Sequence, residues 1–218
     1  MSFDALAPHY RWMEWLLAGE KLQRCRTTFL DQVKSSKHVL IAGEGNGRFL
    51  AALKNELTEA EITCVDSSLP MLLQAQSRIE RFGLKPEGIN FVNADVLEWR
   101  APTAQFDLIV SHFFLDCFPA DQLGRVVEKL SRAATGDAAW LLADFQVPAN
   151  GPWRLRALMI HRLMYGFFRF ATRLPAKSLT PPDMFLEEQG FELKKRSVTE
   201  LGLLHSDLWK RKQEMSAG

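Results

Sequence analysis

The sequence predicts one α/β domain built on a doubly wound, mostly parallel sheet of seven strands, with helices on both faces. Three observations predict this class: short apolar runs that fit buried strands, apolar residues at helical spacing between those runs, and a glycine-rich turn after the first run. Buried strands that alternate with amphipathic helices are typical of parallel sheets covered on both faces. A chain of 218 residues suits one such domain with helical additions.

The elements follow in a regular order. Apolar residues recur at helical spacing as far as Lys34, with Gly19 as a break. Strands are then expected at Lys37–Ala42, Glu61–Val65, Ile89–Val92, Phe106–Ser111 and Ala138–Phe145. Helices are expected between them at Arg48–Leu57, Leu69–Phe82 and Gln122–Ala134.

After Pro148 the alternation stops. The sequence predicts a long helix over Pro152–Thr172, a short helix from Pro181 to Glu188, and two strands at Phe191–Val198 and Leu203–Lys210 that finish the sheet with an antiparallel edge. We therefore divide the single domain into an N-terminal helical lid (1–36), a cofactor-binding core (37–147), a helical insert or substrate cap (148–189) and the C-terminal strands (190–218).

The composition excludes several classes of protein. There are 27 Lys and Arg residues against 26 Asp and Glu residues, and this balance argues against binding nucleic acid through bulk positive charge. Three widely spaced cysteines favour a reduced, cytoplasmic protein. The most apolar stretch, around 155–171, is interrupted by arginines and a histidine, so no membrane-spanning helix is expected, although peripheral contact with a membrane stays open.

The first motif is the turn formed by Gly43, Gly45 and Gly47. Glycines at a strand-to-helix turn let the backbone bend tightly and bring the helix N-terminus close to a ligand. The dinucleotide fingerprint G-x-G-x-x-G would require a further glycine where Arg48 stands. A nucleotide-dependent oxidoreductase is therefore a disfavoured alternative.

Acidic and polar residues then follow the next strands. Asp66 ends the second strand, 19 residues after Gly47, where a carboxylate can accept both hydroxyls of a ribose. Asp95 follows the third strand, where it can accept a hydrogen bond from an adenine amino group. The fourth strand ends in Ser111 and His112. The carboxyl ends of parallel strands share one edge of the sheet, so these residues are expected around one ligand.

Taken together, V-L-x-x-G-x-G-x-G, V-D-x-S-x-x-M-L-x-x-A, N-A-D and F-D-L-I-V-S resemble the class I S-adenosylmethionine-dependent methyltransferases, from about Val39 to Phe145. The resemblance implies the Rossmann-like methyltransferase fold, with S-adenosyl-L-methionine as cofactor and S-adenosyl-L-homocysteine as product. It places the three glycines at the methionine part, Asp66 at the ribose, Ser67 and Met71 beside the adenine, Asp95 and the Val96 backbone at its polar edge, and Ser111 and His112 near the sulfonium.

One departure concerns Ile41, because the family usually has an acid two residues before the first glycine. Glu44, inside the turn, is a candidate substitute, and the alternative is a solvated loop residue. The resemblance implies that Tyr10 contacts the cofactor as part of a lid, with core packing as the alternative.

Methyl transfer needs mainly proximity and orientation, and a base only when the acceptor arrives protonated. His112 and Asp116 are the candidate bases. Their structural alternatives are shaping the pocket and capping the loop. No residue set for a metal is predicted.

The long helix after the fifth strand is basic. No acid occurs between Asp144 and Asp183, whereas six cations fall there: Arg154, Arg156, Arg162, Arg169, Arg173 and Lys177. Such a helix over 152–177 can lie on an anionic membrane or can pack its apolar side over the site as a lid, and the lid is favoured.

Either role suggests an apolar small-molecule or lipid-like acceptor. The N-terminal segment and the insert loosely resemble the quinone- and phospholipid-methylating branch of the family. Nucleic acid is a minor option, because Ser111-His112-Phe113-Phe114 differs from the motif of base amino methylation. The non-enzyme alternative is a methyltransferase-fold protein that binds a membrane or a protein. The sequence does not determine an oligomeric state.

Overall fold

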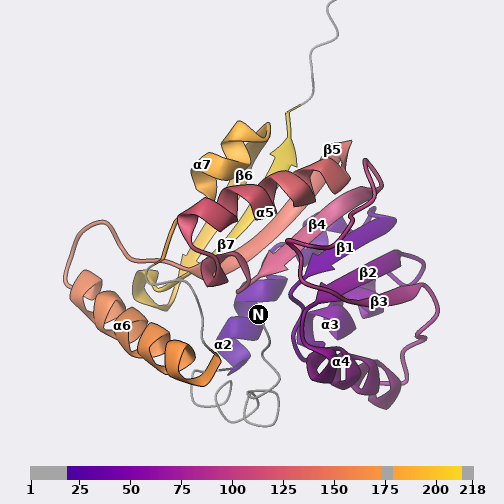
Figure 1. The fold of residues 1–218 in the computed structure, drawn as a ribbon, viewed down its shortest axis with the longest axis horizontal. Helices are drawn as coiled ribbons and strands as arrows, with labels where there is room; N and C mark the ends of the chain where they lie inside the picture. Colours follow the sequence, from indigo (N-terminus) through magenta and orange to yellow (C-terminus); the bar gives the residue numbers. More distant parts are fainter. Residues whose placement is uncertain (1–18, 173–178, 213–218) are drawn as a thin grey trace, which may run out of the picture.

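The computed structural model describes the backbone of residues 19–172 and 179–212, and the side chains of residues 20–163 and 179–212. Within these residues the centre is a seven-stranded sheet in the order β3-β2-β1-β4-β5-β7-β6 (Figure 1). The strands are β1 (His38–Ala42), β2 (Glu61–Asp66), β3 (Ile89–Asn93), β4 (Phe106–His112), β5 (Ala134–Phe145), β6 (Phe191–Thr199) and β7 (Leu204–Arg211). The predicted fold class is confirmed.

Helices cover both faces of this sheet. One face carries α5 and α7, and the other carries α3, α4 and the short 3-10 helix η1. Figure 1 shows α5 in front of the sheet. The bounds are α2 (Gly19–Thr27), η1 (Leu30–Val33), α3 (Arg48–Glu56), α4 (Leu69–Arg81), η2 (Leu115–Cys117), α5 (Ala120–Ala133), α6 (Trp153–Thr172), α7 (Asp183–Glu188) and η3 (Glu200–Gly202). Gly19, expected as a break, is the first residue of α2.

The chain reverses its direction of winding at β1. From β1 it adds β2 and β3 in parallel on one side, and it then crosses to β4 and β5, also parallel, on the other side. The connections that leave β1 and β4 therefore part in opposite directions at the carboxyl edge. Open α/β sheets bind their ligands at this switch point. The glycine turn and the strand-end acids lie there.

The antiparallel strand is β7, which runs between β5 and β6. An ion pair to the buried Asp207 fastens these strands: Arg196 Nε and Nη2 donate to the Asp207 carboxylate at 2.7 and 2.6 Å. Arg196 Nη2 also donates to Asp183 of α7 at 2.7 Å. A two-oxygen arginine contact is geometrically specific, and this one joins the edge strand, its neighbour and the helix that covers them.

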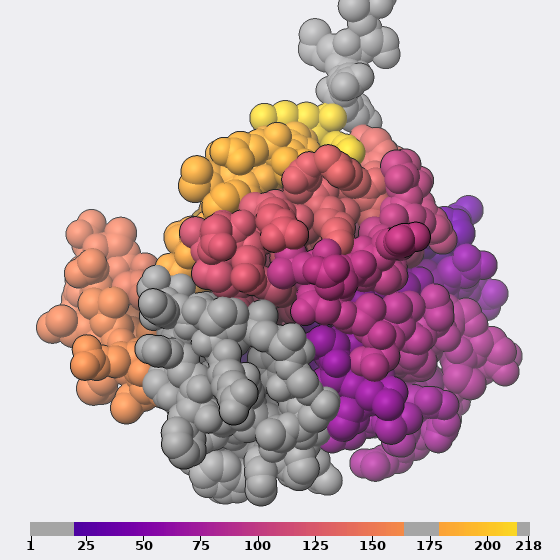
Figure 2. Space-filling model, viewed as in Figure 1, coloured from indigo at the N-terminus to yellow at the C-terminus, as the bar shows by residue number. Residues whose placement is uncertain are grey.

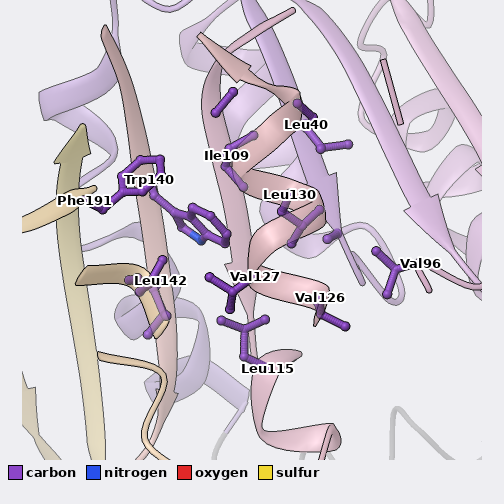
Figure 3. Packing of buried hydrophobic residues seen from close by; sticks show 14 of the residues in the cluster. Leu40, Val96, Ile109, Leu115, Val126, Val127, Leu130, Trp140, Leu142 and Phe191 are labelled. Carbon is purple, nitrogen blue, oxygen red and sulfur yellow. The ribbon is translucent and has the colours of Figure 1, made fainter. Parts of the chain in front are cut away.

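The sheet separates the two large apolar clusters of the core, and a smaller third cluster lies under α2. The larger lies under α5, where Trp140 of β5 is fully buried and meets Phe191 of β6 edge to face at 5.3 Å between ring centroids. Figure 3 shows this pair beside Leu142 and the α5 residues Val127 and Leu130. A ring on β5 and a ring on the edge strand β6 therefore fix the antiparallel edge onto the parallel part of the sheet.

The helix α6 is attached along one side only in its described part. Ala157 and His161 are buried, and His161 Nε2 lies 3.3 Å from the Gln146 carbonyl oxygen. Arg156 Nη1 donates to the Glu200 carbonyl at 3.3 Å. In the chain as far as it is described, no helix is both long and apolar enough to cross a bilayer.

Candidate active site

The turn between β1 and α3 holds the three glycines, which all have positive φ angles. A Cβ atom on Gly43 would lie 2.1 Å from Cδ2 of Phe114, and one on Gly47 would lie 2.6 Å from Cα of Ala75. Neither position accepts a side chain without displacing its neighbour, and at Gly47 the neighbour is backbone. The turn is therefore held between the loop after β4 and the helix α4, with its backbone at the carboxyl edge.

Glu44 turns back onto the start of α3. Its Oε1 accepts hydrogen bonds from the backbone N–H groups of Phe49 and Leu50, at 3.1 and 3.0 Å. Burial raises the pKa of this carboxyl to about 7, against the lowering effect of these two bonds and of the Arg26 charge. Glu44 therefore satisfies two helix-start donors and is not a solvated loop residue.

Ile41, which stands where the family usually has an acid, is almost completely buried in the apolar cluster against α3 and α4. Its register partner on β2 is Cys64, and the Glu44 charge raises the pKa of the Cys64 thiol, after burial as the main cause. The Glu44 charge therefore affects Cys64, the strand partner of Ile41, and Ile41 occupies the position of the usual acid.

Asp66 links two neighbouring segments at the end of β2. Its Oδ2 accepts from the Gly45 N–H at 3.2 Å, and its Oδ1 accepts from the Ser68 N–H at 2.9 Å. Its carbonyl accepts from the Ala94 N–H at 3.1 Å, which ties in the end of β3. The carboxylate is half-buried and held in one orientation by these bonds.

The remaining predicted adenine residues lie near this carboxylate in the fold. Ser67 is half-buried, and Met71 is buried in the first turn of α4. Asp95 is half-buried after β3, where its Oδ1 accepts from the Leu97 N–H at 2.9 Å. Val96 is buried in the cluster under α5. The predicted residues on β2 and β3 therefore share one edge of the sheet.

The two residues at the end of β4 face opposite sides of the sheet. Ser111 is fully buried on the α5 side, and its Oγ accepts from Nε1 of Trp140 at 2.8 Å. His112 lies on the other side, where its ring meets that of Phe49 edge to face at 4.4 Å. Burial, with a smaller contribution from the charge of Arg26, lowers the pKa of His112 well below its usual value. The imidazole is therefore neutral at pH 7.

Arg26, which the sequence reasoning missed, comes from α2 to this side of the site. Its guanidinium is buried, lies 5.2 Å from the ring centroid of Phe113, and acts electrostatically on both Glu44 and His112. Phe113 itself has a positive φ of 52°. Only the packing of a distant helix brings this cation here, and no local motif marks it.

Asp116, a predicted candidate base, lies beside Asp144, which was not predicted. The Asp144 carboxylate accepts from the backbone N–H of Asp116 at 3.2 Å and from that of Phe145 at 2.8 Å. Burial raises the pKa of Asp116 to about 6. Burial and the Asp116 charge raise that of Asp144 well above its usual value. An acid that ends a buried strand was the available signal for Asp144, as it was for Asp66.

Tyr10, which was predicted to contact the cofactor, lies outside the described residues. Among the residues that the structure describes, no group of three or more His, Cys, Asp or Glu side chains is placed to hold a metal ion.

Comparison with known proteins agrees with this arrangement. A family model described as a methyltransferase domain matches residues 39–136, which include the glycine turn and β1 to α5. No curated protein sequence matches the chain.

The chain is similar to several solved structures. With the mitomycin 7-O-methyltransferase MmcR it shares 15% identity at a TM-score of 0.73, over 97% of this chain and 61% of that one, so it spans less than two thirds of that protein's length. With the magnesium protoporphyrin IX methyltransferase of Synechocystis PCC 6803, bound to S-adenosylhomocysteine, the chain shares 18% identity at a TM-score of 0.64, over 87% of this chain and 83% of that one.

With the Burkholderia thailandensis 1,6-didemethyltoxoflavin-N1-methyltransferase the chain shares 19% identity at a TM-score of 0.66, over 96% of this chain and 88% of that one. These similarities show the fold, and the family model identifies the domain within it. The oxidoreductase alternative finds no support in them. Residues 39–136 therefore match a methyltransferase domain, and the chain as a whole shares the fold of these solved methyltransferases.

Proposed function

We propose that the protein transfers a methyl group to an apolar small-molecule or lipid-like acceptor, at oxygen, nitrogen or carbon. The observation that carries this proposal is the set of aromatic rings after β4, one of which lies against the glycine turn. Phe114 lies against Gly43, Phe113 packs on Phe145 with ring centroids 5.1 Å apart, and Phe114 packs on Phe118 at the same distance. Pockets walled by such rings favour apolar ligands.

The residues present at the carboxyl edge fit S-adenosylmethionine. The Asp66 carboxylate has a fixed orientation at the end of β2, and two carboxylate oxygens suit two ribose hydroxyls. Met71 and Val96 offer apolar surface, and Asp95 a polar edge, for an adenine. We propose the following set as cofactor-binding: Tyr10, Gly43, Glu44, Gly45, Gly47, Asp66, Ser67, Met71, Asp95, Val96, Ser111 and His112.

The cofactor, when bound, supplies an activated methyl group on a positively charged sulfur. The protein then has to orient the acceptor and keep water away. Phe113 and Phe114 can do both, because they follow β4 directly and are half-buried, with Phe114 against the glycine turn. The strained backbone at Phe113 fixes the direction in which this loop leaves β4.

Where the acceptor carries a hydroxyl or an ammonium group, a base must take its proton. We propose Asp116 for this role, because a carboxyl with a pKa of about 6 is ionised at pH 7 yet is a stronger base than an ordinary aspartate. Asp144 positions it by accepting its backbone N–H. His112, neutral and packed behind Phe49, is the second candidate.

The division of the chain into lid (1–36), core (37–147), cap (148–189) and C-terminal strands (190–218) is part of this proposal. So is a reduced, cytoplasmic setting. It is supported by Cys25, Cys64 and Cys117, which are free thiols, the first two of them buried.

Calorimetry with S-adenosylmethionine and S-adenosylhomocysteine tests the cofactor site. We expect both to bind, and Asp66→Ala to weaken binding about 10- to 100-fold, because hydrogen bonds to a charged group are lost. The matched control is Asp121→Ala, which removes an exposed acid from the first turn of α5. If neither ligand binds to the wild-type protein, the chain is a non-catalytic member of the fold.

A transfer assay tests the acceptor class. Radiolabelled S-adenosylmethionine is combined with a series of phenols that differ only in alkyl chain length. We expect kcat/KM to rise with chain length, because each added methylene is removed from water on binding. A flat or falling series would contradict an apolar acceptor and leave the cofactor site unaffected.

A further inference from the structure

The described part of α6 turns a mixed apolar and basic face to the solvent. Leu155, Met159 and Leu163 are 76%, 60% and 68% exposed, and Leu158 is 40% exposed. At about 100° per residue, these side chains share one arc of the helix with Arg154 and Arg162. We call these six residues the outer face. Figure 2 shows this part of the helix projecting at the left edge of the molecule.

The opposite side of the helix makes the contacts with the rest of the fold. Ala157 and His161 are buried there, and Arg156 donates to the Glu200 carbonyl. The outer face therefore takes no part in attaching the helix to the rest of the described fold. Four large apolar side chains gathered on one exposed arc indicate an interaction surface, whereas single exposed leucines would not.

The charges on the outer face all have one sign. Some exposed arginines of the described chain are paired, as Arg132 is with Glu128. Arg154 and Arg162 form no ion pair with any residue that the structure describes. The sequence places no acid between Asp144 and Asp183 that could neutralise them.

We propose that the outer face of α6 lies on an anionic lipid bilayer. The leucines and the methionine enter the boundary between headgroups and acyl chains, and the two arginines contact the phosphates on either side of them. Trp153, 46% exposed at the start of the helix, suits the same boundary. This inference rests on the proposed function, because an apolar acceptor concentrates in a bilayer and a protein that uses it gains by binding there.

Vesicle sedimentation tests the surface. The full chain is centrifuged with vesicles of phosphatidylcholine alone and of phosphatidylcholine mixed with phosphatidylglycerol, at low and high salt. We expect binding to the anionic vesicles only, weakened by salt. The double variant Arg154→Ser/Arg162→Ser should bind roughly 30-fold more weakly, because each arginine near an anionic surface contributes roughly fivefold. The variant Leu155→Ser/Met159→Ser should lose roughly tenfold or more.

The matched control is Leu73→Ser/Arg81→Ser on α4, which removes an equally exposed apolar side chain and an exposed cation elsewhere. It should bind like the wild type. Absence of binding to anionic vesicles, or equal binding by all variants, would overturn the proposal. So would a wild-type dimer without lipid that Leu155→Ser/Met159→Ser dissociates, because the face would then belong to a second copy.

Binding to soluble polyglutamate as tight as to vesicles would overturn the proposal too, and would assign the face to an acidic protein. Calorimetry with S-adenosylmethionine on the same variants separates the two proposals. Intact cofactor binding without vesicle binding removes the membrane inference alone. Vesicle binding without cofactor binding removes the proposed function alone.

Discussion

Carboxyl groups end strands on both sides of the switch point, but their surroundings differ. On the cofactor side, Asp66 accepts two backbone N–H groups, from Gly45 and from Ser68, and remains half-buried. On the other side, which we propose binds the acceptor and call the acceptor side, Asp116 and Asp144 lie together, and burial raises the pKa of both. The first arrangement fixes a carboxyl group in one orientation for recognition. The second keeps a proton close to exchange at neutral pH, which is what a base requires.

The strongest test of this difference is Asp116→Asn. We expect kcat with a phenolic acceptor to fall about 10²- to 10⁴-fold, because an amide cannot take the proton. The dissociation constant of S-adenosylmethionine should not change, since Asp116 lies on the acceptor side. Steady-state kinetics and calorimetry on the same preparation measure the two quantities.

An amine that arrives unprotonated gives the matched comparison within one enzyme. With such an acceptor, Asp116→Asn should keep its kcat. If both kinds of acceptor lose activity equally, Asp116 acts through the shape of the site, and the two sides differ in structure but not in chemistry.

The second test introduces backbone strain into the glycine turn on the cofactor side. Gly47→Ala should lower the free energy of unfolding by about 2 to 4 kcal/mol, because φ is 82° and the new Cβ would lie 2.6 Å from Ala75 Cα. Gly83→Ala is the control: φ is 65°, and the Cβ there would meet nothing within 4 Å. It should cost about 1 to 2 kcal/mol from the backbone alone. Urea denaturation measures both, and equal losses would mean that the glycine turn is not tightly packed.

The cofactor side was predictable because its signals are local. Glycines that require positive φ, and an acid that ends an apolar run, are visible in a few consecutive residues. The acceptor side depends on tertiary packing. Arg26 reaches the site from a helix that precedes the sheet, and Ser111 is turned into the core by Trp140, which lies 29 residues further along. No pattern near either residue contains that information.

The boundaries and partners of the strands also depend partly on local sequence and partly on tertiary packing. The predicted helix over 122–134 ends one residue early, because Ala134 starts β5 and pairs with Phe106 across an irregular register. Alanine favours helix, so only the neighbouring strand explains the change. The C-terminal edge was predicted as antiparallel, and the register adds that β7 lies inside and β6 outside. Alternating apolar residues mark a strand but do not name its partner.

The smallest expected effect is a dependence of stability on pH that belongs mainly to the acceptor side. The pKa of Asp116 is raised in the folded protein from an ordinary 3.8 to about 6, so the folded state binds this proton more tightly than the unfolded state. Its contribution is therefore fully present below pH 3.8 and is lost as the pH rises through 6. Relative to the wild type, Asp116→Asn should gain about 1 to 3 kcal/mol between pH 4 and pH 7.

The difference between the two proteins reports Asp116 together with Asp144, whose pKa the Asp116 charge raises, because the other groups that titrate in this range are common to both proteins. Glu44, with a pKa raised to about 7, gives a change of the same sign, and His112, with a lowered pKa, gives one of opposite sign. Both remain in Asp116→Asn and cancel in the difference. The control Asp121→Asn alters an exposed acid and should leave the pH dependence unchanged. If Asp116→Asn shows no gain at pH 7, the proton is not held on the acceptor side. The contrast with Asp66 would then be one of geometry alone.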